Sequence, residues 1–160
     1  MDFIWSPWRY DYLTSGGEKP SGCVFCIGGD QPEKDAERLI VFRGIHNFIS
    51  LNLFPYTSGH LMVAPYEHRD TIVDASPAQT GEMMELAKRG LVALQKLYNP
   101  GGFNLGMNLG TAAGAGIREH FHLHLVPRWT GDANFMTVTG ETRVLPEELS
   151  TTYSRIKAVL

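Results

Sequence analysis

Three histidines alternate with apolar residues in one short segment of this 160-residue chain, His-Phe-His-Leu-His-Leu-Val over 120–126. A β-strand sends alternate side chains to opposite faces. A strand here would therefore place His120, His122 and His124 on one face, about 6–7 Å apart, with the apolar residues facing the core. Because each ring nitrogen needs a partner and imidazole titrates near neutral pH, the alignment favours a functional site over three unrelated histidines.

A metal ion held by all three histidines is one interpretation, since imidazole is the commonest metal ligand. On a strand with a rise of about 3.3 Å per residue, however, His120 and His124 would lie about 13 Å apart. That is too far for one ion with bonds of about 2.1 Å. A central nucleophile, His122, with flanking partners fits the spacing better, because a neutral imidazole is a competent nucleophile at pH 7.

The loop before the histidines reads Asn-Leu-Gly-Thr-Ala-Ala-Gly-Ala-Gly over 108–116. It has almost no side-chain bulk, so its backbone N–H groups can cradle phosphate oxygens. Such a loop is more often a plain turn, and it gains weight here because it adjoins the histidines. The two segments together indicate chemistry on a phosphate-bearing ligand.

The only two cysteines, Cys23 and Cys26, have the spacing of half a tetrahedral zinc site, which needs two more ligands. A redox or disulfide pair is a second interpretation, although no βαβ pattern surrounds the cysteines. A pair of inert buried thiols is a third. The histidines that qualify as further ligands are His46, His60, His68 and His120.

The bulk composition is that of a globular protein, with 43% hydrophobic and 19% charged residues. A net charge of −3 provides no broad electropositive surface, so nucleic acid is not an expected partner. No apolar run approaches the roughly 18–20 residues of a membrane span, and the segment 1–8 does not have the pattern of a signal peptide. We therefore expect a cytoplasmic protein without a membrane partner.

The elements that position these residues follow from the hydrophobic pattern. Short apolar stretches between turn residues predict strands, and these are 39–42, 48–51, 61–64, 103–109 and the histidine segment 120–126. Ser76 at an N-cap, Pro77 and Gln79 predict a helix start, and apolar residues at helical spacing continue the helix to about Tyr98. A short β-like stretch follows residue 134, and a C-terminal helix starts near Pro146.

This order of elements predicts an α+β fold, an antiparallel β-meander with one main helix over about 76–98 and a C-terminal helix. We expect a single domain over 1–160. It would consist of an N-terminal arm with the Cys-x-x-Cys (1–35), a core (36–128) and a C-terminal extension (129–160).

The run His-x-His-x-His, followed by two apolar residues and Pro127-Arg128, resembles the signature of the histidine triad (HIT) family of nucleotide hydrolases and transferases. The likeness covers about 23–128 and includes the Cys-x-x-Cys, the Ser-Gly-His of 58–60 and the Asn-x-Gly of 108–110. Within the family, Glu119 and the segment 128–135 are similar to the bacterial diadenosine tetraphosphate phosphorylases. The resemblance implies a HIT-like fold.

The resemblance implies that His120, His122 and His124 form the catalytic set. His122 would attack the α-phosphorus and form a nucleotidyl-histidine intermediate, and His124 would contact the phosphate and the leaving oxygen. Asn52, followed by Leu53, stands where members usually place an Asp that holds the ribose hydroxyls.

For the loop, the resemblance implies that Asn108 hydrogen-bonds the phosphate or the adjoining ribose. Many members have Gly-Gln-Ser/Thr-Val just before the triad, whereas this chain has Gly114-Ala115-Gly116-Ile117. Because the side-chain donors of that version are missing, phosphate binding would fall to backbone N–H groups of 114–116 and to Thr111.

Resemblance to zinc-bearing bacterial members selects His68 and His120 as partners of Cys23 and Cys26. One structural zinc ion per chain would then join the arm to the first triad histidine, in a closed site without an open position for water. His60, which follows Gly59 at a strand start, we interpret as structural. His46 we interpret as a surface residue.

The function so predicted is nucleotidyl transfer that cleaves dinucleoside polyphosphates such as diadenosine tetraphosphate, with water or orthophosphate as acceptor. The alternatives are an adenosine phosphoramidase, a nucleotide-binding protein with little turnover, and a zinc module that binds nucleic acid, which the acidic balance disfavours. The resemblance also implies a homodimer in which the sheets of two copies join.

Overall fold

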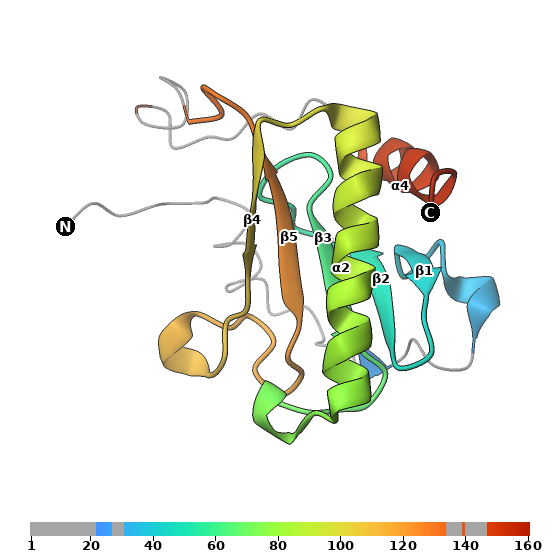
Figure 1. The fold of residues 1–160 in the computed structure, drawn as a ribbon, viewed down its shortest axis with the longest axis vertical. Coiled ribbons are helices and arrows are strands. Elements are labelled where there is room, and N and C mark those ends of the chain that lie inside the picture. Colours follow the sequence, from blue (N-terminus) through green and yellow to red (C-terminus); the bar gives the residue numbers. More distant parts are fainter. Residues whose placement is uncertain (1–21, 27–30, 134–138, 140–146) are drawn as a thin grey trace.

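The computed structural model describes residues 22–26, 31–133, 139 and 147–160. In this part of the chain a five-stranded antiparallel sheet carries a long helix on one face (Figure 1). The strands are β1 (Ile40–Arg43), β2 (Asn47–Leu51), β3 (Leu61–Pro65), β4 (Gly102–Gly106) and β5 (Leu123–Arg128). The helices are α2 (Pro77–Tyr98) and α4 (Leu149–Lys157), and 3-10 turns are η2 (Pro32–Lys34), η3 (Ile72–Asp74) and η4 (Thr111–Ala113). The predicted α+β fold with one main helix is confirmed.

The strand order is β1-β2-β3-β5-β4. It departs from a simple meander at one place, because β5 lies between β3 and β4 and pairs antiparallel with both. In the register, Met62 of β3 faces His124 of β5, and Leu105 of β4 faces Leu125. The histidine segment therefore enters the interior of the sheet, and β4 takes the edge.

Helix α2 begins as its sequence predicts. The hydroxyl of Ser76 accepts a hydrogen bond from the backbone N–H of Gln79 at 3.2 Å, and Pro77 follows the cap. The helix ends at Tyr98, and the following residue, Asn99, caps it with a left-handed φ of 43°. At Gly90 the helix approaches the sheet closely, because a Cβ there would lie 2.9 Å from Cδ1 of Leu125.

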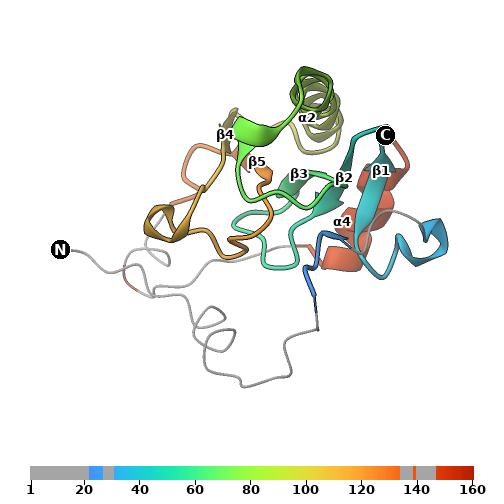
Figure 2. The same cartoon turned by 90° about the horizontal axis from the view of Figure 1, so that it is seen from below.

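The two faces of the sheet carry different residues. On the face that α2 covers, here called the covered face, a hydrophobic cluster joins α2 and the strands to Ile156 of α4. Figure 2 shows α2 lying across this side of the sheet. The opposite face, here called the histidine face, carries a second cluster that includes Phe25, Phe48 and Met62. Along β5, Leu125 belongs to the covered face and His124 to the histidine face.

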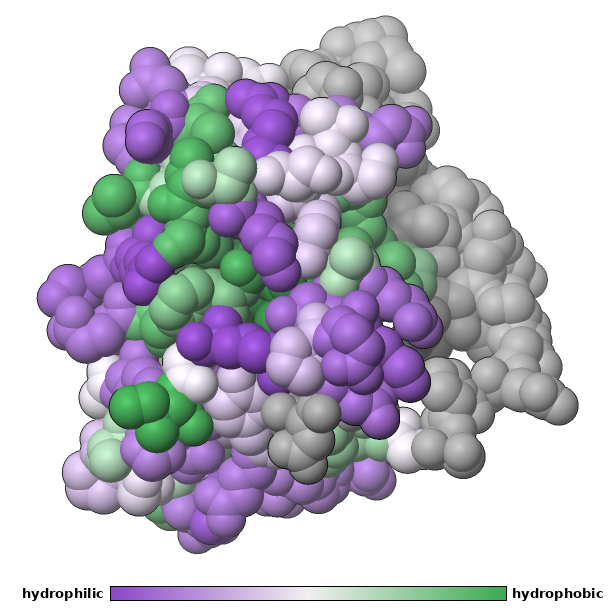
Figure 3. All heavy atoms as spheres, turned by 90° about the vertical axis from the view of Figure 1, so that its right-hand side faces the viewer, coloured by the Kyte–Doolittle hydropathy of each residue, from purple (hydrophilic) through white to green (hydrophobic). Residues whose placement is uncertain are grey.

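Polar anchors join the helices to the strands. The carboxylate of Glu82 on α2 accepts hydrogen bonds of 2.6–2.8 Å from the backbone N–H groups of Ile45, His46 and Asn47, and one of 2.8 Å from the Asn47 side chain. At the last residue of β1, Arg43 pairs with buried Asp35. Figure 3 shows the end of the molecule with β1 and α4, where hydrophilic residues are interspersed with smaller hydrophobic areas.

Some predicted boundaries differ from the observed ones. Strand β5 begins only at Leu123, so His120 and His122 precede it. The backbone there turns to another partner, since the N–H of Phe121 donates to the carbonyl of Arg69 at 2.7 Å. Strand β4 ends at Gly106 instead of 109, and α4 starts at Leu149.

The predicted β-like stretch after residue 134 lies outside the described residues. Among the helices of the described segments, none has both the length and the apolar character needed to cross a bilayer.

Candidate active site

The rings of the histidine segment gather on the histidine face. His124 projects from β5, and the ring of His122, which precedes the strand, lies edge-on to it with the centroids 4.7 Å apart. His120 and His122 are buried, and His124 is half-buried. Although only one of the three histidines lies on a strand, the three rings form one cluster.

The backbone fixes the tautomer of His122. Its Nδ1 lies 3.0 Å from the carbonyl oxygen of His120. Because a carbonyl can only accept a hydrogen bond, the proton of a neutral His122 must reside on Nδ1. The lone pair then resides on Nε2, which has no hydrogen-bond partner among the described residues. Nε2 of His122 is therefore unprotonated and can offer its lone pair to a ligand.

The tautomer of His124 follows from His60 by the same logic. The backbone N–H of Tyr56 donates to Nδ1 of His60 at 3.1 Å, so the proton of His60 resides on Nε2. That Nε2 lies 2.9 Å from Nδ1 of His124 and donates to it. The proton of a neutral His124 therefore resides on Nε2, which can donate to an oxygen of a ligand.

His120 is oriented differently. Its Nε2 lies 2.8 Å from the carbonyl oxygen of Pro65 and carries the proton. Its Nδ1 faces the two cysteines, 3.4 Å from Sγ of Cys23 and 3.7 Å from Sγ of Cys26. The lone pair of His120 thus points away from His122 and toward the thiols.

The electrostatics of the cluster favour neutral rings. Burial lowers the pKa of His122. Burial, together with the neighbouring His122, lowers the pKa of His124 to about 4. The pKa of His120 is lowered as well, again chiefly by burial. At neutral pH all three rings are therefore uncharged, and Nε2 of His122 keeps its lone pair.

Four possible metal ligands converge beside the triad. Cys23, Cys26, His68 and His120 each offer one donor atom, and these four atoms lie within 4.8 Å of one another. Nδ1 of His68 lies 3.0 Å from Sγ of Cys26. Tetrahedral zinc with bonds of about 2.1 Å to nitrogen and 2.3 Å to sulfur separates its ligands by about 3.4–3.8 Å. The donor set suits such an ion, and the Cys26–His68 pair, at 3.0 Å, would have to separate slightly to admit it.

The state of the thiols agrees with a metal site better than with the other interpretations. Both cysteines are free thiols, and Cys26 is exposed, so the two are not an inert buried pair. Although the residue is exposed, partial loss of hydration and the neighbouring Cys23 raise the pKa of the Cys26 thiol to about 11. A coordinated cation deprotonates such a thiol. The arm, through 23–26, thus places two donors against the first triad histidine.

A pocket of about 290 Å³ opens beside His124. It is lined by Asn108, which the sequence predicts as a ligand residue, and by Tyr56 and Val126. At its far end Arg128 pairs with Asp132 at 2.5 Å. The pocket therefore offers space for a ligand next to the Nε2–H of His124.

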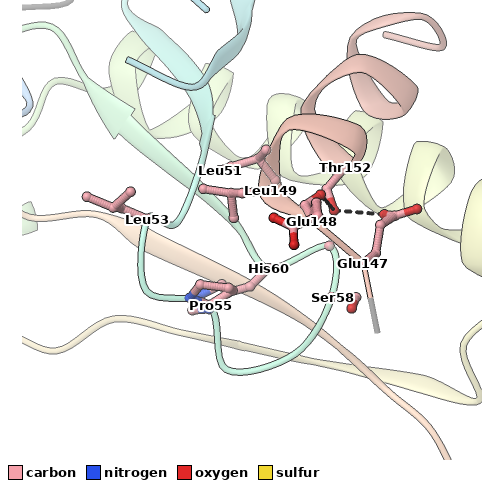
Figure 4. Close-up of a pocket in the computed structure, with 10 residues that line it drawn as sticks. Leu51, Leu53, Pro55, Ser58, His60, Glu147, Glu148, Leu149 and Thr152 are labelled. Atoms are coloured by element: carbon pink, nitrogen blue, oxygen red, sulfur yellow. Dashed lines mark hydrogen bonds between the residues drawn. The ribbon is translucent and has the colours of Figure 1, made fainter. Parts of the chain in front are cut away.

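Asn52 and Leu53 lie at the start of the loop between β2 and β3. The Asn52 carboxamide oxygen accepts from the N–H of Phe54 at 2.9 Å, and its nitrogen lies 3.4 Å from Nδ1 of His60. Leu53 is exposed and lines a second pocket of about 270 Å³ (Figure 4). That pocket lies between the loop and α4, where Glu147 and Glu148 would repel a phosphate.

The loop 108–116 folds partly on itself. Its 3-10 turn η4 is exposed and stands between Gly110 and Gly114, both with positive φ. The N–H of Gly114 donates to the carbonyl of Thr111 at 3.0 Å, and that of Ala115 to the carbonyl of Gly110 at 3.4 Å. Two of the N–H groups predicted to bind phosphate are therefore engaged within the loop, whereas Gly116 is exposed.

Three residues of this cluster were not predicted from the sequence as site residues. His60, interpreted only as structural, is fully buried and hydrogen-bonds His124. The ring of Tyr56 lies 4.6 Å from that of His60, and Phe25 packs against His120 and His122. The available signal for Phe25 was its place between two proposed ligands. His46, interpreted as a surface residue, is exposed.

Known proteins resemble this chain in sequence over most of its length. The family model for the HIT domain matches residues 33–131. The AP-4-A phosphorylase of Mycobacterium tuberculosis is 38% identical over 154 residues, which cover 93% of this chain and 79% of that protein.

Solved structures show the same fold. A Zn-bound histidine triad family protein from Mycobacterium smegmatis has a TM-score of 0.67 at 25% identity, covering 86% of this chain and 92% of that one. A HIT family protein from Bacillus anthracis has a TM-score of 0.58 at 29% identity, covering 70% of this chain and 77% of that one.

Proposed function

This chain belongs to the HIT domain family, and from that premise we propose that it cleaves dinucleoside polyphosphates, such as diadenosine tetraphosphate, through a nucleotidyl-histidine intermediate. One observation carries the proposal. The His120 carbonyl fixes the tautomer of His122 and the His60 side chain that of His124, so that a lone pair on one Nε2 stands beside a proton on the other. An unprotonated nucleophile next to a hydrogen-bond donor is what displacement at phosphorus requires.

In the first step, Nε2 of His122 attacks the α-phosphorus and forms a P–N bond as the bond from phosphorus to the bridging oxygen breaks. From diadenosine tetraphosphate the leaving group is ATP, and AMP remains on His122. The Nε2–H of His124 hydrogen-bonds the oxygen that gains charge. Because a polyphosphate is a weak base, it leaves without full protonation by a strong acid.

In the second step, an acceptor attacks the same phosphorus and releases His122. Orthophosphate would yield ADP, and water would yield AMP. We propose orthophosphate, because the relative that is 38% identical carries the name AP-4-A phosphorylase. Since both acceptors use the same histidines, the products decide between them.

We assign the nucleotide to the histidine face. Asn108 would bind the phosphate or the ribose in the pocket that it shares with His124. Asn52, with Leu53, would hold the ribose hydroxyls, and the loop segment 111–116 would approach the phosphate. These assignments rest on the family resemblance and on the position of Asn108.

Products from diadenosine tetraphosphate, with and without orthophosphate, test the proposal. We expect ADP and ATP when phosphate is present, and slow formation of AMP and ATP when water is the only acceptor. The variant His122→Ala should bind the nucleotide but lose turnover and the covalent nucleotidyl adduct. His46→Ala, which removes an exposed histidine outside the cluster, serves as the control and should retain turnover. Turnover by His122→Ala would contradict the mechanism.

Two assembly features complete the proposal. The donor set of Cys23, Cys26, His68 and His120 would hold one zinc ion, which would supply a rigid link between the arm and the triad. Strand β4 lies at an edge of the sheet and exposes Leu105, so we assign to this edge the contact between two copies. Native mass spectrometry tests both, with two chains and two zinc ions as the expected composition and a metal-free monomer as the contradicting one.

A further inference from the structure

The turn that carries the two cysteines points one side chain into the protein. The N–H of Cys26 donates to the carbonyl of Cys23 at 3.1 Å and closes the turn. Between them, Val24 is 45% exposed whereas Phe25 is 5% exposed. Phe25 is therefore the residue through which this turn contacts the histidine face.

The Phe25 ring contacts two triad histidines at once. Its centroid lies 5.2 Å from that of His120 and 4.9 Å from that of His122, both in tilted arrangements. Phe48 stands behind it at 6.2 Å. Aromatic rings attract one another at these separations, and in a close-packed interior such contacts restrict ring rotation. Phe25 thus limits the orientations that the His122 ring can adopt.

The His122 ring needs this restriction. Its hydrogen bond to the carbonyl of His120 fixes Nδ1 but leaves the ring free to tilt about that contact. The edge-on His124 limits tilting on one side, at a centroid distance of 4.7 Å. Phe25 supplies a second wall at 4.9 Å. Between the two walls, Nε2 is held in a narrow range of directions.

The same turn provides two of the four metal donors, and a third is His120. Two series of contacts therefore link the possible metal ligands to the His122 ring. One runs through the backbone carbonyl of His120, and the other runs from the cysteines through the Phe25 ring.

We propose that Phe25 is a positioning residue, held by the metal-binding turn, that keeps the His122 ring aligned for attack on the α-phosphorus. The inference rests on the proposed function, because it concerns the nucleophile of that reaction. In-line displacement demands such alignment, and a misplacement of about 1 Å costs on the order of 100-fold in rate.

The variant Phe25→Leu tests the inference because it keeps an apolar side chain but removes the ring. Phe25→Tyr keeps the ring. Phe48→Leu is the matched control, since it makes the same substitution one ring farther from His122. Each full-length protein, purified with its zinc, is examined for zinc content, affinity for diadenosine tetraphosphate, the rate of adduct formation in a single turnover, and the nitrogen-15 NMR signal of the His122 Nδ1–H group.

For Phe25→Leu we expect one zinc ion per chain, an affinity within about threefold of wild type, adduct formation slowed on the order of 10-fold to 100-fold, and a broadened Nδ1–H signal. Phe25→Tyr should restore the rate and the signal, and Phe48→Leu should stay within about threefold. A wild-type rate and an intact signal in Phe25→Leu would overturn the inference, as would equal slowing in Phe48→Leu. If wild type forms no adduct, the proposed function fails, and the NMR signal alone then decides the positioning role.

Discussion

The covered face and the histidine face share strand β5 but use opposite means to hold it. On the covered face, Leu125 is fully buried in a hydrophobic cluster whose side chains are held together by apolar packing. On the histidine face, each imidazole has a specific partner at 2.8–3.0 Å, namely Pro65 for His120, the His120 carbonyl for His122, and His60 for His124. Adjacent residues of one strand therefore serve packing and chemistry separately.

Because the two faces are held in different ways, substitutions on them should affect different properties of the protein. Apolar packing is non-directional and scales with the buried area, so a loss on the covered face lowers stability while the folded molecules remain active. Hydrogen bonds to rings are directional, so a loss on the histidine face disturbs orientation and protonation first. Substitutions on the two faces can test this separation.

The largest expected effect is on the covered face. Leu125→Ala should lower the free energy of unfolding by about 2–5 kcal/mol, because it leaves a cavity under α2 where Gly90 approaches the sheet. Urea denaturation measures the loss. The control Val92→Ala truncates a side chain of α2 that is 69% exposed, and should change stability by about 0.5 kcal/mol or less.

Turnover of folded Leu125→Ala, measured well below its melting temperature, should stay within about threefold of wild type, since the substitution removes no partner of a ring nitrogen. A collapse of turnover in a fully folded sample would break the distinction between the two faces.

Much of this arrangement is accessible to sequence reasoning because it rests on local rules. The cap at Ser76, the helix to Tyr98 and the apolar strands follow from residue type and spacing, and the structure has them within a few residues. The grouping of Cys23 and Cys26 with two histidines followed from ligand spacing together with the family resemblance, and the donor atoms do converge.

What the sequence does not provide is pairing across long separations. Either β4 or β5 could take the place beside β3, because both segments alternate apolar and polar residues. Which of the two is inserted depends on which strand buries more apolar surface. His60 lies 64 positions before His124, so its hydrogen bond is invisible to any local pattern. Regular strand pairing begins only at Leu123, because the N–H of Phe121 donates to the carbonyl of Arg69 instead. That hydrogen bond also joins segments that lie far apart in the sequence.

The second prediction concerns acid and the histidine face. The pKa of His124 is about 4 in the folded protein because of burial, against 6.5 for an ordinary histidine. Below pH 6.5 His124 binds a proton in the unfolded chain but not in the folded protein. The contribution of His124 to stability is therefore complete above pH 6.5 and falls as the pH drops toward 4. From His124 alone the loss between about pH 7.5 and about pH 5 should be about 2 kcal/mol.

His124→Asn should remove that part of the pH dependence, as measured by urea unfolding at the two pH values. The surface variant His46→Asn should keep the wild-type slope. An unchanged slope in His124→Asn would mean that His124 is not held neutral by burial.

The smallest predicted effect returns to the covered face, where Glu82 is a charged exception among apolar contacts. Its pKa is lowered by hydrogen bonds from Ile45, His46 and Asn47, which outweigh the opposing effect of burial. In Glu82→Gln the remaining oxygen can keep the three donors that face Oε2, but the new amide group cannot accept from Ile45. We expect a loss of about 1 kcal/mol at pH 7.

The pH range in which stability is lost separates Glu82 from His124, because both contributions have the same sign and fall as the pH drops. A carboxylate with a lowered folded pKa stabilises the protein above its ordinary pKa of 4.5, and that contribution disappears as the pH falls through the folded value. The gap between wild type and Glu82→Gln in urea midpoint should therefore persist at pH 5, where the His124 contribution is already being lost, and close only at lower pH. Glu85→Gln, which removes a charge from the exposed pair with Lys88, should match wild type throughout. If the difference in urea midpoint disappeared between pH 7 and 5, Glu82 and His124 would lose their contributions over the same pH range. The two faces would then not respond to acid independently.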